Sequence, residues 1–268
     1  MPDAFDSLEP DQTVTVLPRH LAGRGSADLR TIWPFPFDDD WSLYQHAEDG
    51  SAVASSPCLR LRTGYVPDPD RPGHMQWITA AHHSPFGPAT WQITFDATTP
   101  VELLRDTHAE LLDLYLEGRH STQDPLFDDR TPPHEAYAPL LARGWSHMVK
   151  TDGTQHFLAP DIFGGVQHKY AEPRLNTPAE PAWTAWAGYA DDPHWRVRFS
   201  RATPTTLVAA FTASLLSTEP VQRTVKDVPL RTRDRVYVAS ATATPQQKTP
   251  AAPVASPASK PTVPRRTR

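Results

Sequence analysis

Three histidines and a tryptophan crowd one short stretch of the chain, at His74, Trp77, His82 and His83. Imidazole nitrogens are common zinc ligands, so this group could hold a metal ion. Neighbouring side chains of a strand point to opposite faces, however, and His82 and His83 would then face away from each other. We therefore interpret the group as polar residues beside a loop and expect no metal site.

Other residues that could support catalysis lack the partners that their chemistry requires. The carboxylates of Asp38, Asp39 and Asp40 could take a hard cation, but a solvated turn is expected because the Gly-spaced loop of a calcium hand is missing. Cys58 is the only cysteine and has no histidine at motif spacing, which favours a buried structural thiol. Neither a Gly-x-Ser-x-Gly elbow nor a glycine-rich phosphate loop occurs, and no cofactor is expected.

Two strand patterns carry the remaining candidate residues. Large apolar residues alternate with polar ones in both, which indicates half-buried strands. The apolar positions are Trp91, Ile93, Phe95, Trp195, Val197 and Phe199. The residues between them would face away from the core, and we predict that Gln92, Thr94, Arg196 and Arg198 form a contact surface.

The same succession of motifs occurs twice, about 104 residues apart. Each succession runs from a tryptophan through an Asp-Gly pair and a Pro-containing turn to the strand pattern and a Thr-Pro pair. The matched positions are Trp41 and Trp145, Asp49-Gly50 and Asp152-Gly153, Ser56-Pro57 and Ala159-Pro160, and Thr99-Pro100 and Thr203-Pro204. This self-similarity predicts two tandem copies of one unit.

Each copy is predicted to be an α+β unit, an antiparallel sheet of about four strands followed by one packed helix. Asp-Gly pairs are strong hairpin signals. The expected strands cover residues 41–44, 52–62, 75–83 and 91–95 in the first copy, and 145–149, 154–168, 182–189 and 195–199 in the second. The first helix is expected to have Thr99 as its cap, Pro100 at its first position and Glu102 completing a capping box.

The predicted organisation has five parts: a flexible N-terminus (1–13), a first unit (14–116), a linker (117–136), a second unit (137–217) and a mostly disordered basic tail (218–268). The first unit is expected to begin with an edge strand or short turn over residues 14–23. The second unit is expected to begin with a short helical segment over residues 139–144.

The net charge of −5 divides unevenly along the chain. The tail holds ten basic and three acidic residues (+7), and the remainder holds 16 basic and 28 acidic residues (−12). An acidic body does not attract nucleic-acid phosphates, so only tail cations could make weak nucleic-acid contacts. The cations in question are Lys260, Arg265, Arg266 and Arg268.

The N-terminal residues are acidic and have no apolar core, so no signal peptide is expected. No run of about 18 apolar residues occurs, which predicts that the chain does not span a membrane. A cytoplasmic protein is the resulting expectation.

Three motifs resemble those of an actinobacterial family known as domain of unknown function 317. They are the run Leu17-Pro-Arg-His-Leu-Ala-Gly23, the aromatic segment Trp33-Pro-Phe-Pro-Phe37, and the paired Trp-x-x-x-Phe and Thr-Pro-x-x-Leu blocks. Members of this family are typically double-copy proteins, and the resemblance covers about residues 14–217. Since the family has no established activity, the resemblance implies no catalytic or binding residue.

These patterns favour a non-enzymatic interaction protein that binds an unknown protein partner through the polar side of its strands. One alternative is an enzyme with a pocket between the copies, for which His82, His83 and Trp186 are the expected lining. Another is a protein that associates with nucleic acid through its basic tail.

Overall fold

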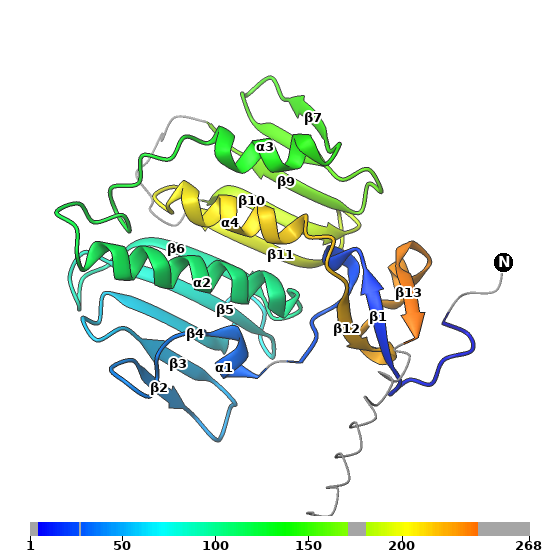
Figure 1. The fold of residues 1–268 in the computed structure, drawn as a ribbon, viewed down its shortest axis with the longest axis horizontal. Helices are drawn as coiled ribbons and strands as arrows, with labels where there is room; N and C mark the ends of the chain where they lie inside the picture. The colour runs from blue at the N-terminus through cyan, green and yellow to red at the C-terminus, as the bar shows by residue number, and fades with distance from the viewer. Residues whose placement is uncertain (1–4, 27, 171–180, 241–268) are drawn as a thin grey trace, which may run out of the picture.

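The computed structural model describes residues 5–26, 28–170 and 181–240, which form one ten-stranded antiparallel sheet, a smaller three-stranded sheet and several helices (Figure 1). The first five strands of the large sheet are β2 (Ser42–Gln45), β3 (Ala52–Ser55), β4 (Leu61–Pro67), β5 (Met75–His82) and β6 (Ala89–Asp96). The other five are β7 (Ser146–Val149), β8 (Gln155–Leu158), β9 (Gly164–His168), β10 (Pro181–Gly188) and β11 (Pro193–Ser200). The predicted mixed α+β class with antiparallel strands is confirmed.

The strand order in the large sheet is β2-β3-β4-β5-β6-β11-β10-β9-β8-β7. From either edge to the centre of the sheet, five strands therefore follow one another in chain order. We call β2–β6 with the helix after them the first half, and β7–β11 with the helix after them the second half. The halves meet where β6 pairs with β11, with Phe95 opposite Val197. They therefore share one continuous sheet and do not pack as two separate sheets.

Each half holds five strands, and the prediction of about four is wrong. The expected single strands over 52–62 and 154–168 are both interrupted by a turn that contains a proline. In both turns the ladder ends because one residue has a left-handed backbone, Leu59 with φ 56° and Ile162 with φ 64°. Both predicted Asp-Gly hairpins are present, and Gly50 and Gly153 adopt the positive φ that such turns favour.

The helices cover one face of the large sheet. They are α1 (Leu29–Ile32), α2 (Val101–Gly118), α3 (His134–Ala142) and α4 (Thr205–Leu215). Helices α2 and α4 lie side by side across the middle of this face (Figure 1). The apolar strand residues face them as predicted, since Trp91, Phe95, Trp195 and Phe199 are all at most 1% exposed.

Helix α2 does not begin with the predicted capping box. Pro100 occupies the N-cap position, no side chain caps the helix, and the buried Thr99 hydroxyl has no hydrogen-bond partner. Glu102 turns away to accept two hydrogen bonds from Arg223, at 2.8 and 2.5 Å. A buried guanidinium requires a carboxylate partner more strongly than a helix end requires a cap, and this tertiary contact overrides the local signal.

Both ends of the described chain meet in the three-stranded sheet, which we call the terminal sheet. Its strand order is β12 (Val221–Thr224), β1 (Thr13–Leu17) and β13 (Tyr237–Ser240). Short 3₁₀ helices follow β1 and β12: η1 (Arg19–Leu21), η2 (Val225–Asp227) and η3 (Leu230–Arg235). Residues 14–23 are therefore not an edge of the first unit, and residues 221–240 are ordered in a region predicted to be mostly disordered tail.

The rest of the predicted tail, with Lys260, Arg265, Arg266 and Arg268, lies outside the described residues. Within the residues that the structure describes, no helix combines the length and the apolar character needed to cross a bilayer.

Candidate functional site

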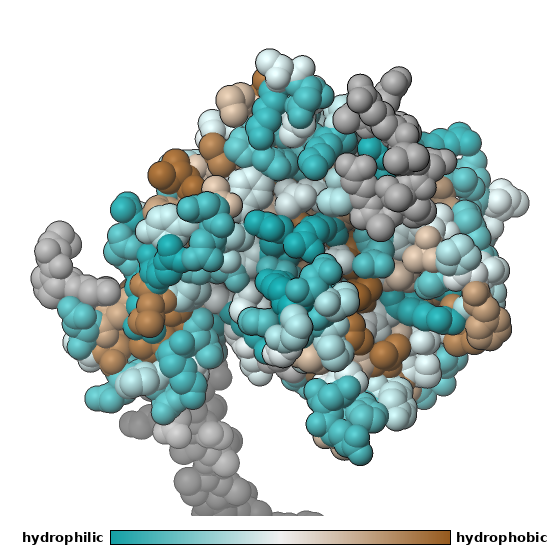
Figure 2. Space-filling view, turned by 180° about the vertical axis from the view of Figure 1, so that it is seen from behind, coloured by the Kyte–Doolittle hydropathy of each residue, from teal (hydrophilic) through white to brown (hydrophobic). Residues whose placement is uncertain are grey.

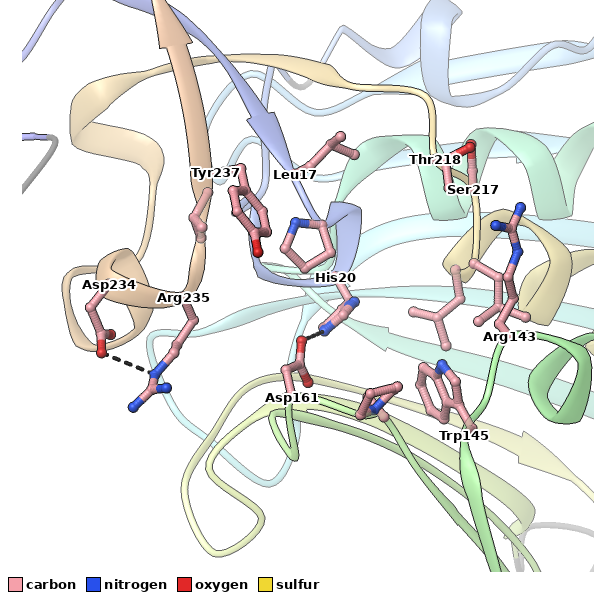
Figure 3. A pocket seen from close by; sticks show the side chains of 16 residues that line it. Leu17, His20, Arg143, Trp145, Asp161, Ser217, Thr218, Asp234, Arg235 and Tyr237 are labelled. Carbon is pink, nitrogen blue, oxygen red and sulfur yellow. Dashed lines mark hydrogen bonds and ion pairs between the residues drawn. The ribbon is translucent and has the colours of Figure 1, made fainter.

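A cavity lies where the terminal sheet meets the second half, and we call it the junction pocket (Figure 3). Its volume is about 700 Å³, within the range of small-molecule sites in proteins. The lining residues are Leu17, Pro18, His20, Arg143, Trp145, Ala159, Pro160, Asp161, Leu215, Leu216, Ser217, Thr218, Asp234, Arg235, Val236 and Tyr237. Residues from both ends of the chain and from its middle therefore share one cavity.

The junction pocket exists because α4 is short. Helix α2 has 18 residues and α4 has 11, a difference of about 10 Å in length at 1.5 Å per residue. Ser217, Thr218 and Pro220 follow the end of α4, and a proline cannot continue a helix. The space that two further turns would fill remains open beside the end of α4.

Trp145 forms an apolar wall of the junction pocket. It follows α3 directly, and the positive φ of Gly144, 76°, turns the chain from the helix end toward β7. The backbone N–H of Trp145 donates to the Leu140 carbonyl at 3.1 Å, which holds the Trp145 backbone against the end of α3. The ring is 6% exposed, and its aromatic neighbour is His20, whose ring is edge-on at 6.3 Å.

His20 and Asp161 form the polar centre of the junction pocket, and Figure 3 shows their side chains pointing toward each other. His20 Nε2 lies 2.9 Å from Asp161 Oδ2, and the His20 carbonyl accepts from Trp195 Nε1 at 2.9 Å. Burial acts to raise the pKa of Asp161, but hydrogen bonds from His20 and from the Phe163 N–H outweigh it and lower that pKa. Asp161 is therefore an anion at neutral pH.

Arg19 holds η1, and with it His20, against the helices. Its guanidinium is 3% exposed and donates to Asp106 Oδ2 at 3.0 Å and to Ser214 Oγ at 2.8 Å. It also donates to Ser217 Oγ at 3.1 Å, just past the end of α4. A buried arginine with this many fixed acceptors positions the backbone around it.

The rim of the junction pocket carries charged and aromatic side chains. Arg235 pairs with Asp234 at 3.0 Å, whereas Arg143 has no ion-pair partner among the described residues. Tyr237 of β13 is 81% exposed and contributes an aromatic ring at the mouth. The pocket thus offers an apolar interior, a half-buried carboxylate and a cation at its rim.

The junction pocket lacks the nucleophile that a His–Asp pair would activate. In the described part of the chain, the His20 ring makes no hydrogen bond to a serine, threonine or cysteine. Ser217 lines the same pocket, but its hydroxyl already accepts from Arg19 and from the Glu219 N–H at 3.2 Å. The arrangement is therefore suited to hold a molecule and does not form a catalytic triad.

The four residues predicted as a contact surface lie together on the sheet face opposite the helices. Gln92 and Thr94 on β6 neighbour Arg196 and Arg198 on β11, with Arg198 opposite Thr94. Gln92, Thr94 and Arg198 line a smaller cavity of about 220 Å³. Hydrophilic residues gather over the middle of this face (Figure 2).

The residues expected to line a pocket between the copies are not brought together. Trp186 is buried over Gly165, stacks on His156 at 5.5 Å and lies opposite Arg196. His82 is on β5 and hydrogen-bonds the Gly87 carbonyl. The strand registers separate His82 from Trp186 by about 20 Å in the direction of the strands, before the distance across the sheet is added. His83 is exposed and packs on Phe127. The expected pocket lined by His82, His83 and Trp186 is therefore wrong.

Cys58 is also placed differently from its prediction. It lies exposed in the turn between β3 and β4, at one side of a cavity of about 390 Å³ that Arg60 and Tyr115 share. Within the described residues, no group of three or more histidine, cysteine, aspartate or glutamate side chains is arranged to hold a metal ion.

Sequence reasoning missed His20, Asp161 and Arg143 as site residues. His20 and Asp161 are 141 positions apart, so no motif spacing links them. Two signals were available: the segment containing His20 has no counterpart before Trp145, and Ser217–Pro220 ends the second helix early. Both features mark the places where the halves differ, and the junction pocket lies between them.

Comparison with known proteins assigns the chain to a family. The model of the SPDY family, a domain of unknown function (DUF317), matches residues 55–116 and 164–221. No curated protein and no solved structure matches the chain. The two matched regions cover corresponding parts of the first and second halves. The DUF317 model therefore matches the chain in two separate regions, which is consistent with a tandem double-copy DUF317 protein.

Proposed function

We propose that the protein is a binding protein whose junction pocket takes a small amphipathic organic anion. The observation that carries this proposal is the 700 Å³ cavity, in which the wall of Trp145 adjoins the unpaired cation of Arg143. An apolar cavity with a few converging polar groups is the usual form of a small-molecule site. An apolar body would contact Trp145, and a negative group would reach Arg143.

A non-enzymatic role is favoured because the polar side chains of the pocket are already hydrogen-bonded to each other or to neighbours. His20 is hydrogen-bonded with Asp161, and the Ser217 hydroxyl accepts from Arg19. A nucleophile must contact its base within hydrogen-bond reach, and no such contact joins the described residues of the junction pocket. Binding without chemistry is the simpler use of this geometry.

The proposed test uses 1-anilinonaphthalene-8-sulfonate, an aromatic anion that fluoresces when bound in apolar surroundings. We expect the full-length chain to bind one molecule per chain. The Thr218→Trp variant, which fills the mouth from an exposed position, should weaken this binding at least tenfold. The matched control is Ser121→Trp, because Ser121 is also exposed and follows the end of α2.

The Ser121→Trp control should bind the probe like the original chain. Equal affinity in both variants would place the probe elsewhere and remove the support for the junction pocket. Absence of saturable binding to the original chain would do the same. Near-ultraviolet circular dichroism of each variant verifies that probe binding does not come from loosened packing.

We further propose that the two halves are copies of one structural unit. Supporting this, Leu59 and Ile162 both have a left-handed backbone and occupy matching turns. In each turn the backbone N–H of this residue donates to the carbonyl three residues earlier. The N-cap residues Pro100 and Pro204 also share their backbone angles, with φ −53° and −52° and ψ 128° and 130°. Equivalent positions then differ by 103 or 104 residues.

A second candidate function is protein binding through the sheet face opposite the helices. Arg196 and Arg198 favour it, because both are half-buried on the side of β11 that faces away from the helices, and neither has an ion-pair partner in the described part of the chain. Unpaired arginines beside polar groups suit a partner that presents carboxylates. An acidic protein surface is therefore the proposed partner.

A further inference from the structure

The first half already contains a side chain in the place that corresponds to the junction pocket. Tyr115, in the last turns of α2, packs edge-on against Trp41 with ring centroids 5.4 Å apart. Trp41 is the counterpart of Trp145. In the first half Tyr115 of α2 contacts this tryptophan, whereas in the second half α4 ends too early to provide an equivalent residue. Residue 115 would correspond to residue 219, which lies beyond the end of α4.

The cavity beside Tyr115 shares two lining segments with the junction pocket, the proline-containing turn and the end of the helix. It includes Pro57 and Cys58, the counterparts of Pro160 and Asp161, together with the end of α2. Its volume is about 390 Å³, against 700 Å³ for the junction pocket. The two cavities thus occupy matching places, and the one that contains the phenol of Tyr115 is the smaller.

Tyr115 and Cys58, the counterpart of Asp161, line the same cavity. Burial, together with the nearby Cys58, raises the pKa of Tyr115 to about 12. In the second half the matching position is a carboxylate that is 29% exposed and has oxygen lone pairs left for another donor. A hydroxyl placed like that of Tyr115 would therefore meet a stronger acceptor.

We propose that the ligand of the junction pocket is a hydroxy-substituted aromatic molecule. Its ring would contact Trp145, as the ring of Tyr115 contacts Trp41 in the first half. Its hydroxyl would donate to Asp161, which occupies the position of Cys58 in the first half. This inference rests on the proposed function and adds the ligand class. The negative group expected near Arg143 would be a further substituent on the same ring system.

The test compares 2-naphthol with 2-methylnaphthalene as competitors of 1-anilinonaphthalene-8-sulfonate on the full-length chain. The two competitors match in size, and only the naphthol donates a hydrogen bond. A hydrogen bond to a charged acceptor predicts that the naphthol binds between about ten- and a hundredfold more tightly. The Asp161→Asn variant keeps the side-chain shape and should bring this ratio to within about threefold.

Asp152→Asn is the matched control, since Asp152 also accepts a backbone N–H in a turn of the second half. It should leave the preference for naphthol unchanged. Equal displacement by both competitors would overturn the hydroxyl assignment while leaving the pocket proposal intact, because the probe still binds. A naphthol preference that persists in Asp161→Asn would overturn the role of Asp161. If the probe itself does not bind, the proposed function fails first.

Discussion

Acidification should destabilise this protein through His108, a buried histidine on the sheet-facing side of α2. Its ring is 1% exposed and contacts Phe35 and Phe95, and Nε2 lies 2.8 Å from the Thr79 hydroxyl. Burial lowers the pKa of His108 from 6.5 to about 4. Between these values the unfolded chain binds a proton that the folded chain excludes, so stability falls as the pH falls through this window.

The size of the effect follows from the two pKa values. The full difference of about 2.5 pKa units corresponds to about 3 kcal/mol below pH 4, and about 2 kcal/mol of it is lost between pH 7.5 and pH 5. Urea unfolding at these two pH values measures the free energy of unfolding. His168 also has a pKa lowered to about 4 by burial and adds to the total loss, so a variant is needed to isolate His108.

His108→Leu removes the titrating group and leaves Thr63 and Thr79 as mutual hydrogen-bond partners at 3.0 Å. The loss between pH 7.5 and 5 should be about 2 kcal/mol smaller in this variant than in the original chain, whatever the variant's stability at pH 7.5. Equal losses in the two proteins, within about 0.5 kcal/mol, would refute the assignment of His108 as the neutral buried group.

Two further predictions, each with a control variant, concern other contacts. Glu102→Gln removes the charge that neutralises the buried Arg223 and should lower the free energy of unfolding by about 3 kcal/mol in urea; Asp11→Asn, in an exposed pair, should change it by less than about 0.5 kcal/mol. Reversing Arg196 and Arg198 to glutamate should abolish retention on immobilised polyglutamate, whereas Arg130→Glu, at an exposed arginine elsewhere, should leave retention unchanged. Unchanged retention of the double variant would contradict the acidic-partner candidate.

The strands and main helices were predictable because their signals are local. Alternation of large apolar residues with polar ones specified β6 and β11, and it also placed Gln92, Thr94, Arg196 and Arg198 on one face. Asp-Gly pairs specified both hairpins. These features depend on residues a few positions apart, where side-chain periodicity and turn conformation decide the structure.

Contacts between distant residues decided the rest. The sequence alone determined a twofold succession of strands and helices with an apolar side. Only the tertiary structure joined the halves through β6 and β11, ordered residues 221–240 against β1, and paired His20 with Asp161. Such contacts arise from burial and charge pairing in three dimensions, which no spacing along the chain encodes. The junction pocket depends on all three and on the early end of α4, and for this reason it was visible only in the folded protein.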